Sequence, residues 1–432
     1  MKDNPAQKLL KTFNKILKSK EIMSKILYSI GILVVFRILS SIPVVGIKGD
    51  AIKKLFEGSS FTEVAAMGSS SALEQASVIV IGLGPYINAS VILQLLSTII
   101  PKLEQLRKEG MQGRRVISMY TRYLTVPLAI LQSFMIYSAL RGIPDATGQP
   151  LIGDLSTLQL ITMFSTLTAG SIFMMWLSEL VSESALGGGS TLLIFYGIVS
   201  NIPYLFIRGT QYNDFWEIVM IVAIYIFLIA MVIYLSEAER KIKVMYSKRV
   251  RTGSVYESYI PLKLTQFGVM PVIFATSLFY FPRLIADFIR GQNFSDKANE
   301  IALWITQKST DPWIQNIGLF VLIILFAFFY VTVVFNTEEY AENLQKSGAF
   351  IPGVRPGKAT ADYLRRAVYR LTAVGSVFLA FLAILPNLLT NVDFIKVSLV
   401  SGTGLLIAIG AVLEMKRQVE SMVVVRGYDK YL

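Results

Sequence analysis

Long apolar segments separated by short polar ones run along most of the chain. The runs Ala76–Ile100, Pro312–Thr337 and Leu371–Asn391 contain no charged residue. A helix needs about 20 consecutive apolar residues to cross the hydrocarbon core of a bilayer. The pattern therefore predicts an all-α membrane protein with ten transmembrane helices, at residues 24–42, 76–100, 120–140, 156–178, 187–206, 215–235, 264–284, 313–336, 369–388 and 394–414.

The connections between these spans share the basic residues unevenly. When basic residues at the span ends are counted with the adjoining connection, both termini and the connections after the even-numbered spans hold 30 of the 41 Lys and Arg residues. The other connections hold 10, and Arg37 lies inside the first span. Basic residues gather on the cytoplasmic side of membrane proteins, so we expect both termini in the cytoplasm. Ten spans would also divide into two inverted halves of five, 26–208 and 209–414, followed by a cytoplasmic tail, 415–432, although no clear sequence repeat relates the halves.

Composition agrees with a membrane protein and removes several kinds of chemistry. The chain has 432 residues, of which 53% are hydrophobic and 16% charged, against about a quarter charged in soluble domains. Cysteine and histidine are absent, which excludes cysteine–histidine zinc sites, thiol nucleophiles and histidine acid–base catalysis. The sequence also has no Gly-x-x-x-x-Gly-Lys-Ser/Thr phosphate loop. We expect no enzyme activity and no cofactor, although a Ser–Lys or carboxylate-only mechanism stays open.

Three polar segments are rich in basic residues. Residues 1–25 carry lysines at helical spacing beside apolar residues, which predicts an amphipathic helix on the membrane surface. The connections 236–263 and 336–370 either fix the topology or dock an acidic partner or an RNA backbone. Their length favours docking, because long loops usually have a function. The net charge of +12 fits anionic lipid as well as RNA.

Glycine and proline interrupt two of the predicted spans. Span two opens with the small, polar stretch Gly68–Ser77 and continues into Gly82-Leu83-Gly84-Pro85-Tyr86-Ile87, and span seven contains Gly268-Val269-Met270-Pro271. The prolines each remove a helical hydrogen bond, and the glycines allow close approach. Both interruptions are equally consistent with simple kinks. The stretch 68–77 is either an ordinary exterior loop or a segment folded back to membrane depth, where irregular backbone must be shielded from lipid.

Several motifs resemble the SecY family, the bacterial protein-conducting channel. They occur in order between about Ile26 and Val425: Val35-Phe36-Arg37 with Ile42-Pro43; Gly84-Pro85-Tyr86-Ile87 with Gln94-Leu95-Leu96; Gly113-Arg114-Arg115 with Tyr120-Thr121-Arg122-Tyr123; Tyr259-Ile260-Pro261-Leu262-Lys263; and Ile351-Pro352-Gly353-Val354-Arg355-Pro356-Gly357. The resemblance implies two pseudo-symmetric inverted halves of five helices around a central hourglass pore with a plug and a lateral gate.

By motif position, the resemblance implies that a ring of aliphatic side chains closes the waist of the pore. A narrow aliphatic ring resists wetting, so it would hold back water and ions and still fit around a passing polypeptide. The ring maps to Leu83, Ile87, Ile194, Ile198, Ile273 and Ile407. Without the resemblance, each of these residues would be read as ordinary helix or lipid packing.

The resemblance also implies a plug and a side exit into the lipid. The plug aligns with about 65–77 and maps to Met67, Gly68, Ser69, Ser70, Ser71, Ala72 and Leu73. Its serines stand where the family has a more glycine-rich segment. The lateral gate lies between spans two and three on one side and spans seven and eight on the other. Its polar residues are Asn88, Gln94, Gln132 and Thr276, whose weak bonds suit a clasp that an apolar segment opens, although routine interhelical bonding explains them equally well.

In the family the two long loops dock a motor or a ribosome, and small subunits complete the complex. The docking residues map to Arg240, Lys241, Lys248, Arg249, Arg251 and Arg355. The implied partners are SecE, SecG, the SecA ATPase, translating ribosomes, signal-peptide-bearing polypeptides and anionic lipid. One segment, Glu183–Ser190, departs from the family, which usually has a positive residue and an Asn-Gly pair there. We expect the geometry near Ile194 to differ from the family for this reason.

These implications lead to a functional prediction with two rivals. We expect a multi-pass protein of the bacterial plasma (inner) membrane that conducts unfolded secretory polypeptides and releases membrane helices sideways. The main alternative is a secondary transporter of a small solute, which would place ionisable residues at mid-membrane. Spans two, seven, eight, nine and ten carry none at their centres. An intramembrane protease would need an embedded Asp pair or a Ser–His dyad, which the sequence does not offer.

Overall fold

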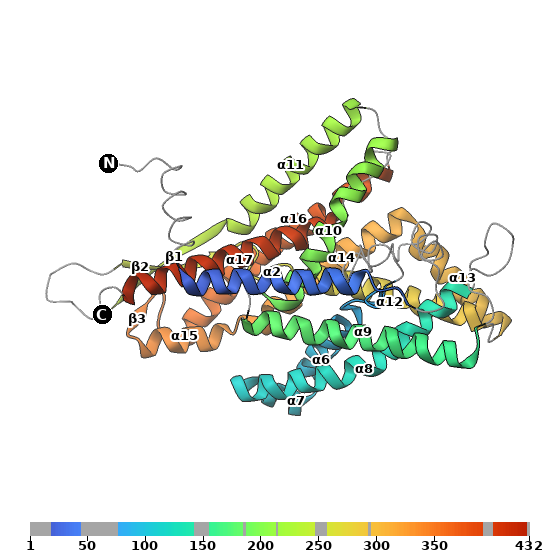
Figure 1. Cartoon of the computed structure of the whole chain (residues 1–432). Coiled ribbons are helices and arrows are strands. Elements are labelled where there is room, and N and C mark those ends of the chain that lie inside the picture. Colours follow the sequence, from blue (N-terminus) through green and yellow to red (C-terminus); the bar gives the residue numbers. More distant parts are fainter. Residues whose placement is uncertain are drawn as a thin grey trace. The chain divides into compact units, whose positions relative to one another are not determined.

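The computed structural model describes residues 19–44, 77–141, 155–184, 187–212, 215–246, 257–292, 295–391 and 401–429. These residues are almost all helical (Figure 1). The chain divides into two compact units, one containing Met1–Arg208, Tyr280–Asp311 and Ile407–Leu432, the other Gly209–Phe279 and Pro312–Leu406.

The described part of the first unit is mostly helical. Its helices are α2 (Lys20–Ser40), α6 (Gly84–Ile99), α7 (Pro101–Lys108), α8 (Met111–Arg141), α9 (Thr157–Ser184), α10 (Gly189–Tyr212) and α13 (Asp296–Thr310). It also holds the second part of α12 (Met270–Gln292) and most of α17 (Gly402–Asp429). The helix α2 begins where the Ser19 hydroxyl oxygen accepts a hydrogen bond from the Ile22 amide at 3.4 Å, which is the usual role of serine at a helix start.

The second unit combines helices with a small sheet. Its helices are α11 (Phe215–Glu237), the first part of α12, α14 (Pro312–Val334), α15 (Thr337–Lys346) and α16 (Lys358–Asn391). The core of this unit lies between α14 and α16. Leu319, Ile323 and Ala327 recur every four residues on one buried face of α14, the spacing that places side chains on one side of a helix.

Each range predicted to span the membrane contains a helix in the described part of the chain. Five of these helices are long and apolar enough to cross a bilayer, namely α2, α9, α11, α14 and α16. The pair α6 and α7, bent by 101° at Ile100, adds a sixth if it is one broken span.

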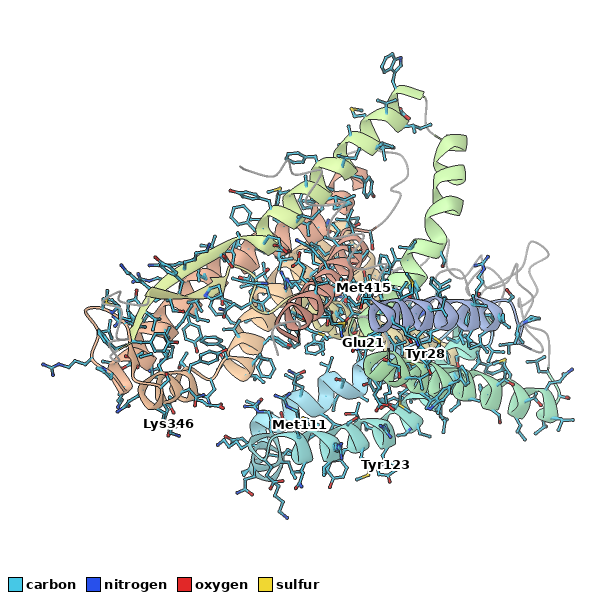
Figure 2. The ribbon with its side chains drawn as sticks, turned by 60° about the vertical axis from the view of Figure 1, so that its left-hand side comes forward. Glu21, Tyr28, Met111, Tyr123, Lys346 and Met415 are labelled. Carbon is cyan, nitrogen blue, oxygen red and sulfur yellow. The ribbon has the colours of Figure 1, made fainter. Side chains whose placement is uncertain are left out.

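Apolar side chains cover much of the outer surface of these helices. On α11, Trp216, Phe227 and Tyr234 are 78%, 65% and 78% exposed. On α8, Met111 and Tyr123, both labelled in Figure 2, are 75% and 67% exposed. So much exposed apolar surface would be unfavourable in water, and it is the surface that lipid covers.

The start of the second span differs from the helix predicted at 76–100. Residues Val78–Leu83 form buried turns, and α6 begins only at Gly84. This segment is anchored by a bridge between Pro43 and Ser77 and by a hydrogen bond from the Val78 amide to the Ile42 carbonyl at 3.0 Å. Pro85 therefore lies in the first turn of α6, where a missing amide hydrogen costs nothing, and it does not break a helix in its middle.

A three-stranded sheet joins the two long basic connections, which the sequence had suggested were loops. Strands β1 (Glu239–Tyr246) and β2 (Glu257–Lys263) pair antiparallel, with Glu239 opposite Lys263. Strand β3 (Ala349–Phe350), from the other connection, pairs with the end of β1. The residues after Arg240 alternate between exposed and buried, with Ile242 and Val244 inward, which is the two-residue period of a strand.

Candidate pore ring, gate and docking loops

The same backbone arrangement starts α6 in the first unit and α12 in the second. Gly82 and Gly268 both adopt left-handed conformations, with φ of 59° and 60°. Each donates its amide hydrogen to the carbonyl three residues earlier, Ile79 or Thr265, at 2.9 and 3.2 Å. A glycine takes this conformation without steric cost. Each helix begins two residues after its glycine, with proline as its second residue.

This shared start places Ile87 and Ile273 at equivalent positions. Each isoleucine is the fourth residue of its helix, and its amide bonds the carbonyl of the residue just after the turn glycine, Leu83 or Val269. The two side chains are 6% and 3% exposed. The sequence showed that the glycine–proline theme recurs, and the structure shows that it builds the same local geometry in both units.

A second equivalent pair lies on α10 and α17. Both helices start with a glycine, Gly189 and Gly402, and in both the sixth residue is a candidate ring isoleucine, Ile194 and Ile407. Each starting glycine lies against a neighbouring backbone carbonyl, Ser178 for Gly189 and Ala383 for Gly402, with no room for a side chain. Spans two and seven, and spans five and ten, are the pairs that two five-helix halves would relate.

All six candidate ring residues are buried. Leu83, Ile194 and Ile407 are fully inaccessible, and Ile198 is 5% exposed, one turn beyond Ile194 on the same face of α10. Burial shows that these side chains do not line the outer surface. Aliphatic side chains brought together at one level would exclude water from that level.

Two small residues of α9 hold the turn segment that precedes Ile87. A side chain at Gly170 would overlap the Val78 carbonyl, so the absence of one allows α9 to lie directly against the turn. The next residue, Ser171, donates its hydroxyl hydrogen to the Gly82 carbonyl at 3.1 Å and is fully buried. The turn, and with it the start of α6, is therefore fixed from one side by α9.

The candidate gate residues have neighbours within their own units. Thr276 is buried and donates its hydroxyl hydrogen to the carbonyls of Val272 and Ile273, both at 2.9 Å, in its own helix. Gln132 of α8 is 9% exposed and lies beside Gly84, whose Cβ position would be 3.2 Å from the Gln132 Oε1 atom. Asn88 and Gln94 lie on α6 and are half-buried. The candidate plug residues Met67–Leu73 lie outside the described residues.

One candidate docking residue, Arg355, extends from a rigid turn. Gly353 and Gly357 have φ of 81° and 93° on either side of it, and the hydroxyl of buried Thr360 on α16 donates to the Arg355 carbonyl at 2.8 Å. The backbone is thereby held to α16 while the side chain is exposed. Among the described residues, no ion pair is formed by the Arg355 guanidinium.

The other docking candidates lie on the β1–β2 hairpin. Arg240 and Lys241 are exposed on β1, and Lys241 forms an ion pair with Glu239 at 3.3 Å. Lys248, Arg249 and Arg251 lie outside the described residues. The hairpin and the Arg355 turn belong to one sheet-linked assembly, because β3 ends one residue before the Ile351–Gly357 motif begins.

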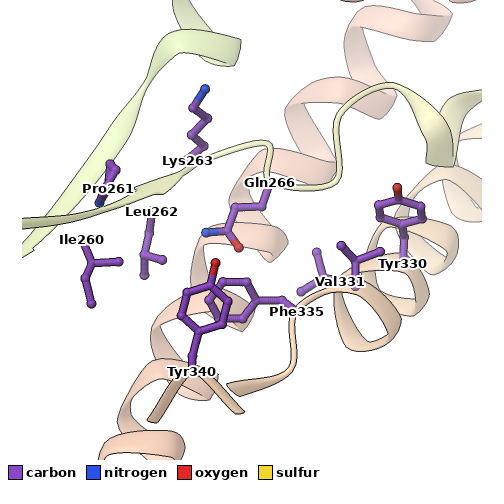
Figure 3. Close-up of a pocket in the computed structure, with 10 residues that line it drawn as sticks. Ile260, Pro261, Leu262, Lys263, Gln266, Tyr330, Val331, Phe335 and Tyr340 are labelled. Atoms are coloured by element: carbon purple, nitrogen blue, oxygen red, sulfur yellow. The ribbon is translucent and has the colours of Figure 1, made fainter. Parts of the chain in front are cut away.

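A cavity of about 250 Å³ lies under this assembly, between β2 and the corner where α14 meets α15. Ile260 and Leu262 of β2 face Phe335 and Tyr340 across it, whereas Lys263 points away (Figure 3). The Phe335 and Tyr340 rings stack, with centroids 4.7 Å apart. Strand β2 therefore packs over the stacked Phe335 and Tyr340 rings, with the cavity between them.

Sequence reasoning missed an ion pair and a loop contact that tie helices together in the first unit. Arg122 Nε of α8 donates to Glu179 Oε1 of α9 at 2.7 Å. The loop before α10 bonds to Glu414 and Gln418 of α17. These partners are far apart in sequence, so only the charged residues at predicted helix ends could have suggested them.

Comparisons with known proteins agree with this architecture. The SecY family model matches residues 77–416. The protein translocase subunit SecY of Streptomyces galbus is 37% identical over 98% of this chain and its own full length, and that of Mycobacterium leprae is 36% identical with the same coverage. A solved protein-conducting channel superposes with a TM-score of 0.68 at 20% identity, over 94% of this chain and 93% of its own. The Sec61 channel of a canine ribosome–channel complex gives 0.65 at 20% identity, with the same coverage.

The similarity extends over nearly the whole chain and its relatives, and the range matched by the family model contains both Gly82 and Arg355. The chain belongs to the SecY family.

Proposed function

We propose that this chain is the channel subunit of a protein translocase and conducts unfolded polypeptides across a membrane. The observation that carries the proposal is the pair of equivalent helix starts, Gly82–Ile87 and Gly268–Ile273, which give each unit a buried isoleucine at the same place. Membership of the SecY family, whose full-length relatives are translocase subunits, gives the function its class. The chain acts as a conduit and not as an enzyme.

In this proposal ten membrane spans form two inverted halves, 26–208 and 209–414, with both termini in the cytoplasm of a bacterial cell. The six buried aliphatic residues at positions 83, 87, 194, 198, 273 and 407 form the ring at the waist. The ring closes around a passing chain and excludes water when empty. The segment 65–77 plugs the pore from outside, and Asn88, Gln94, Gln132 and Thr276 lie along the exit into lipid.

The energy for transport comes from partners that dock on the hairpin and the Arg355 turn. A solved relative of this fold is bound in a ribosome–channel complex, which supports a ribosome as one partner. The basic residues of both connections suit RNA phosphates or an acidic motor surface such as SecA. SecE and SecG complete the complex in the membrane.

A reconstitution experiment distinguishes the proposed protein channel from the rival function, transport of a small solute. The purified complex is placed in sealed vesicles with an ATP-driven motor and a radiolabelled secretory precursor. The proposal expects the precursor to become protected from added protease only when the motor and ATP are present. The transporter hypothesis would be favoured if protection of the precursor never exceeded the level in empty vesicles and the vesicles took up a small solute against its gradient.

Reversing the charge of Arg355 should selectively weaken partner docking. We expect Arg355→Glu to lower ribosome binding to vesicles at least about tenfold, because ~1.4 kcal/mol corresponds to a factor of ten and a hydrogen bond to a charged group contributes about 1.5–3 kcal/mol. Co-sedimentation of ribosomes with vesicles measures this. Lys297→Glu is the matched control, since it makes the same charge change on the exposed surface of α13, outside both basic connections. Equal losses for both variants would show that only overall charge matters.

A further inference from the structure

The loop between α9 and α10 is bonded directly to the C-terminal helix α17. The Gly187 amide donates to Gln418 Oε1, and the Gly188 amide donates to the Glu414 carboxylate. Glu414 and Gln418 are four residues apart, so they lie on the same face of α17. Two consecutive backbone donors thus meet two acceptors one helical turn apart.

The two loop glycines and Gly189, the first residue of α10, each meet a separate requirement. Gly187 has φ of 96°, a conformation that favours glycine. A Cβ atom on Gly188 would be 2.9 Å from Glu414 Oε1, so a side chain there would displace the carboxylate. Gly189 lies against the Ser178 carbonyl, and its amide donates to the Ser182 hydroxyl oxygen at 3.0 Å. The loop is therefore fixed to α9 on one side and to α17 on the other.

The contact lies at nearly the same distance from a ring residue on each helix. Ile194 follows Gly188 by six residues along α10, which is about 9 Å at 1.5 Å per residue. Ile407 precedes Glu414 by seven residues along α17, which is about 10.5 Å. Each distance runs along the helix axis from the contact to the isoleucine. Gly188, Ile194, Ile407 and Glu414 all belong to the first unit.

We propose that the Gly187–Gly188 amides and the Glu414–Gln418 face form a latch that sets the relative height of α10 and α17. Glu414 and Gln418 are positioning residues, which keep Ile194 and Ile407 at one level. The part of the proposal that concerns the ring rests on the proposed function. A slip of one helix by a single residue moves its isoleucine by about 1.5 Å along the axis and turns it away from its neighbours.

The latch is tested by measuring structure and leakage in the same variants. The native chain has no cysteine, so spin labels can be placed at Val199 of α10 and Val412 of α17, which are 40% and 46% exposed. Glu414→Leu removes the acceptor, whereas Glu414→Gln keeps one acceptor oxygen. Gly188→Ala disrupts the same hydrogen bond from the loop side, because the added methyl group would displace the Glu414 carboxylate. Glu420→Leu, an exposed acid on α17, is the control.

We expect Glu414→Leu and Gly188→Ala to shift or broaden the distribution of label distances by about 1.5 Å or more. The same variants should raise ion leakage from vesicles several-fold. Glu414→Gln and Glu420→Leu should resemble the parent in both measurements. Unchanged label distances in Glu414→Leu and Gly188→Ala would overturn the latch. Altered distances without added leakage would leave the latch standing and refute the assignment of Ile194 and Ile407 to the ring, which is a failure of the proposed function.

Discussion

Replacing Ile87 and Ile273 together with asparagine should make vesicles that contain the channel at least about ten times leakier to small ions. The two residues occupy equivalent buried positions, each the fourth residue of a helix that follows the same glycine turn. An amide at these positions attracts water that an aliphatic side chain excludes, since burying an unpaired amide costs about 2–7 kcal/mol. A barrier to permeation that falls by only ~1.4 kcal/mol raises the rate tenfold. Loss of a potassium gradient from sealed vesicles measures the leak.

Two sets of controls separate the ring from general damage to the protein. Ile87→Val with Ile273→Val keeps the aliphatic surface and should leave the seal nearly intact. Asparagine at Ile99 and Leu278, which lie on the same two helices and are 74% and 41% exposed, makes an equal chemical change away from the ring. If these outer substitutions leak as much as the ring substitutions, the seal does not depend on residues 87 and 273.

Replacing Gly170 with alanine should destabilise the protein by about 3 kcal/mol, the upper end of the usual cost of overpacking. The new Cβ atom would overlap the Val78 carbonyl. A backbone atom cannot move aside as a flexible side chain can, because Val78 is also held by its bond to Ile42. The neighbouring bond from Ser171 to the Gly82 carbonyl would be strained as well. Unfolding by SDS titration in mixed micelles measures the free energy.

The matched control for Gly170 is Gly31→Ala on α2. Gly31 is also helical, but nothing lies within 4 Å of its Cβ position. There alanine should be neutral or stabilise by up to about 1 kcal/mol, because alanine has the higher helix propensity. If the two variants have the same stability, the turn at Val78–Leu83 is not packed against α9 as described.

Hydrophobic patterning predicted where the helices lie, because a span must be apolar over its whole length. It could not find the true start of α6. The turn segment Val78–Ile81 is as apolar as the helix that follows, so hydropathy does not distinguish the two. The information lies in the left-handed Gly82 and the bridge from Ser77 to Pro43, which depend on a partner distant in sequence.

The basic connections show a second limit of reasoning from the sequence. Their charge suggested docking loops. The alternation of polar and apolar residues after Arg240 was visible in the sequence as the signal of a strand. The pairing of Tyr246 with Ala349 was not, because it joins residues about one hundred positions apart. The bonds from Gly187 and Gly188 to α17 are equally non-local. The ring residues were assigned by resemblance, and their equivalence in pairs becomes visible only when the helix starts are known.

Crosslinking of a trapped polypeptide to the ring shows whether residues 87, 194, 273 and 407 surround a translocating chain. Single cysteines at Ile87, Ile194, Ile273 and Ile407 are introduced into the naturally cysteine-free chain, and a secretory polypeptide is stalled partway across the membrane. We expect all four positions to crosslink to the same short stretch of the polypeptide, whereas cysteines at exposed positions of the same helices should not. If none of the four crosslinks, and a small solute instead protects them from modification, the channel account is contradicted.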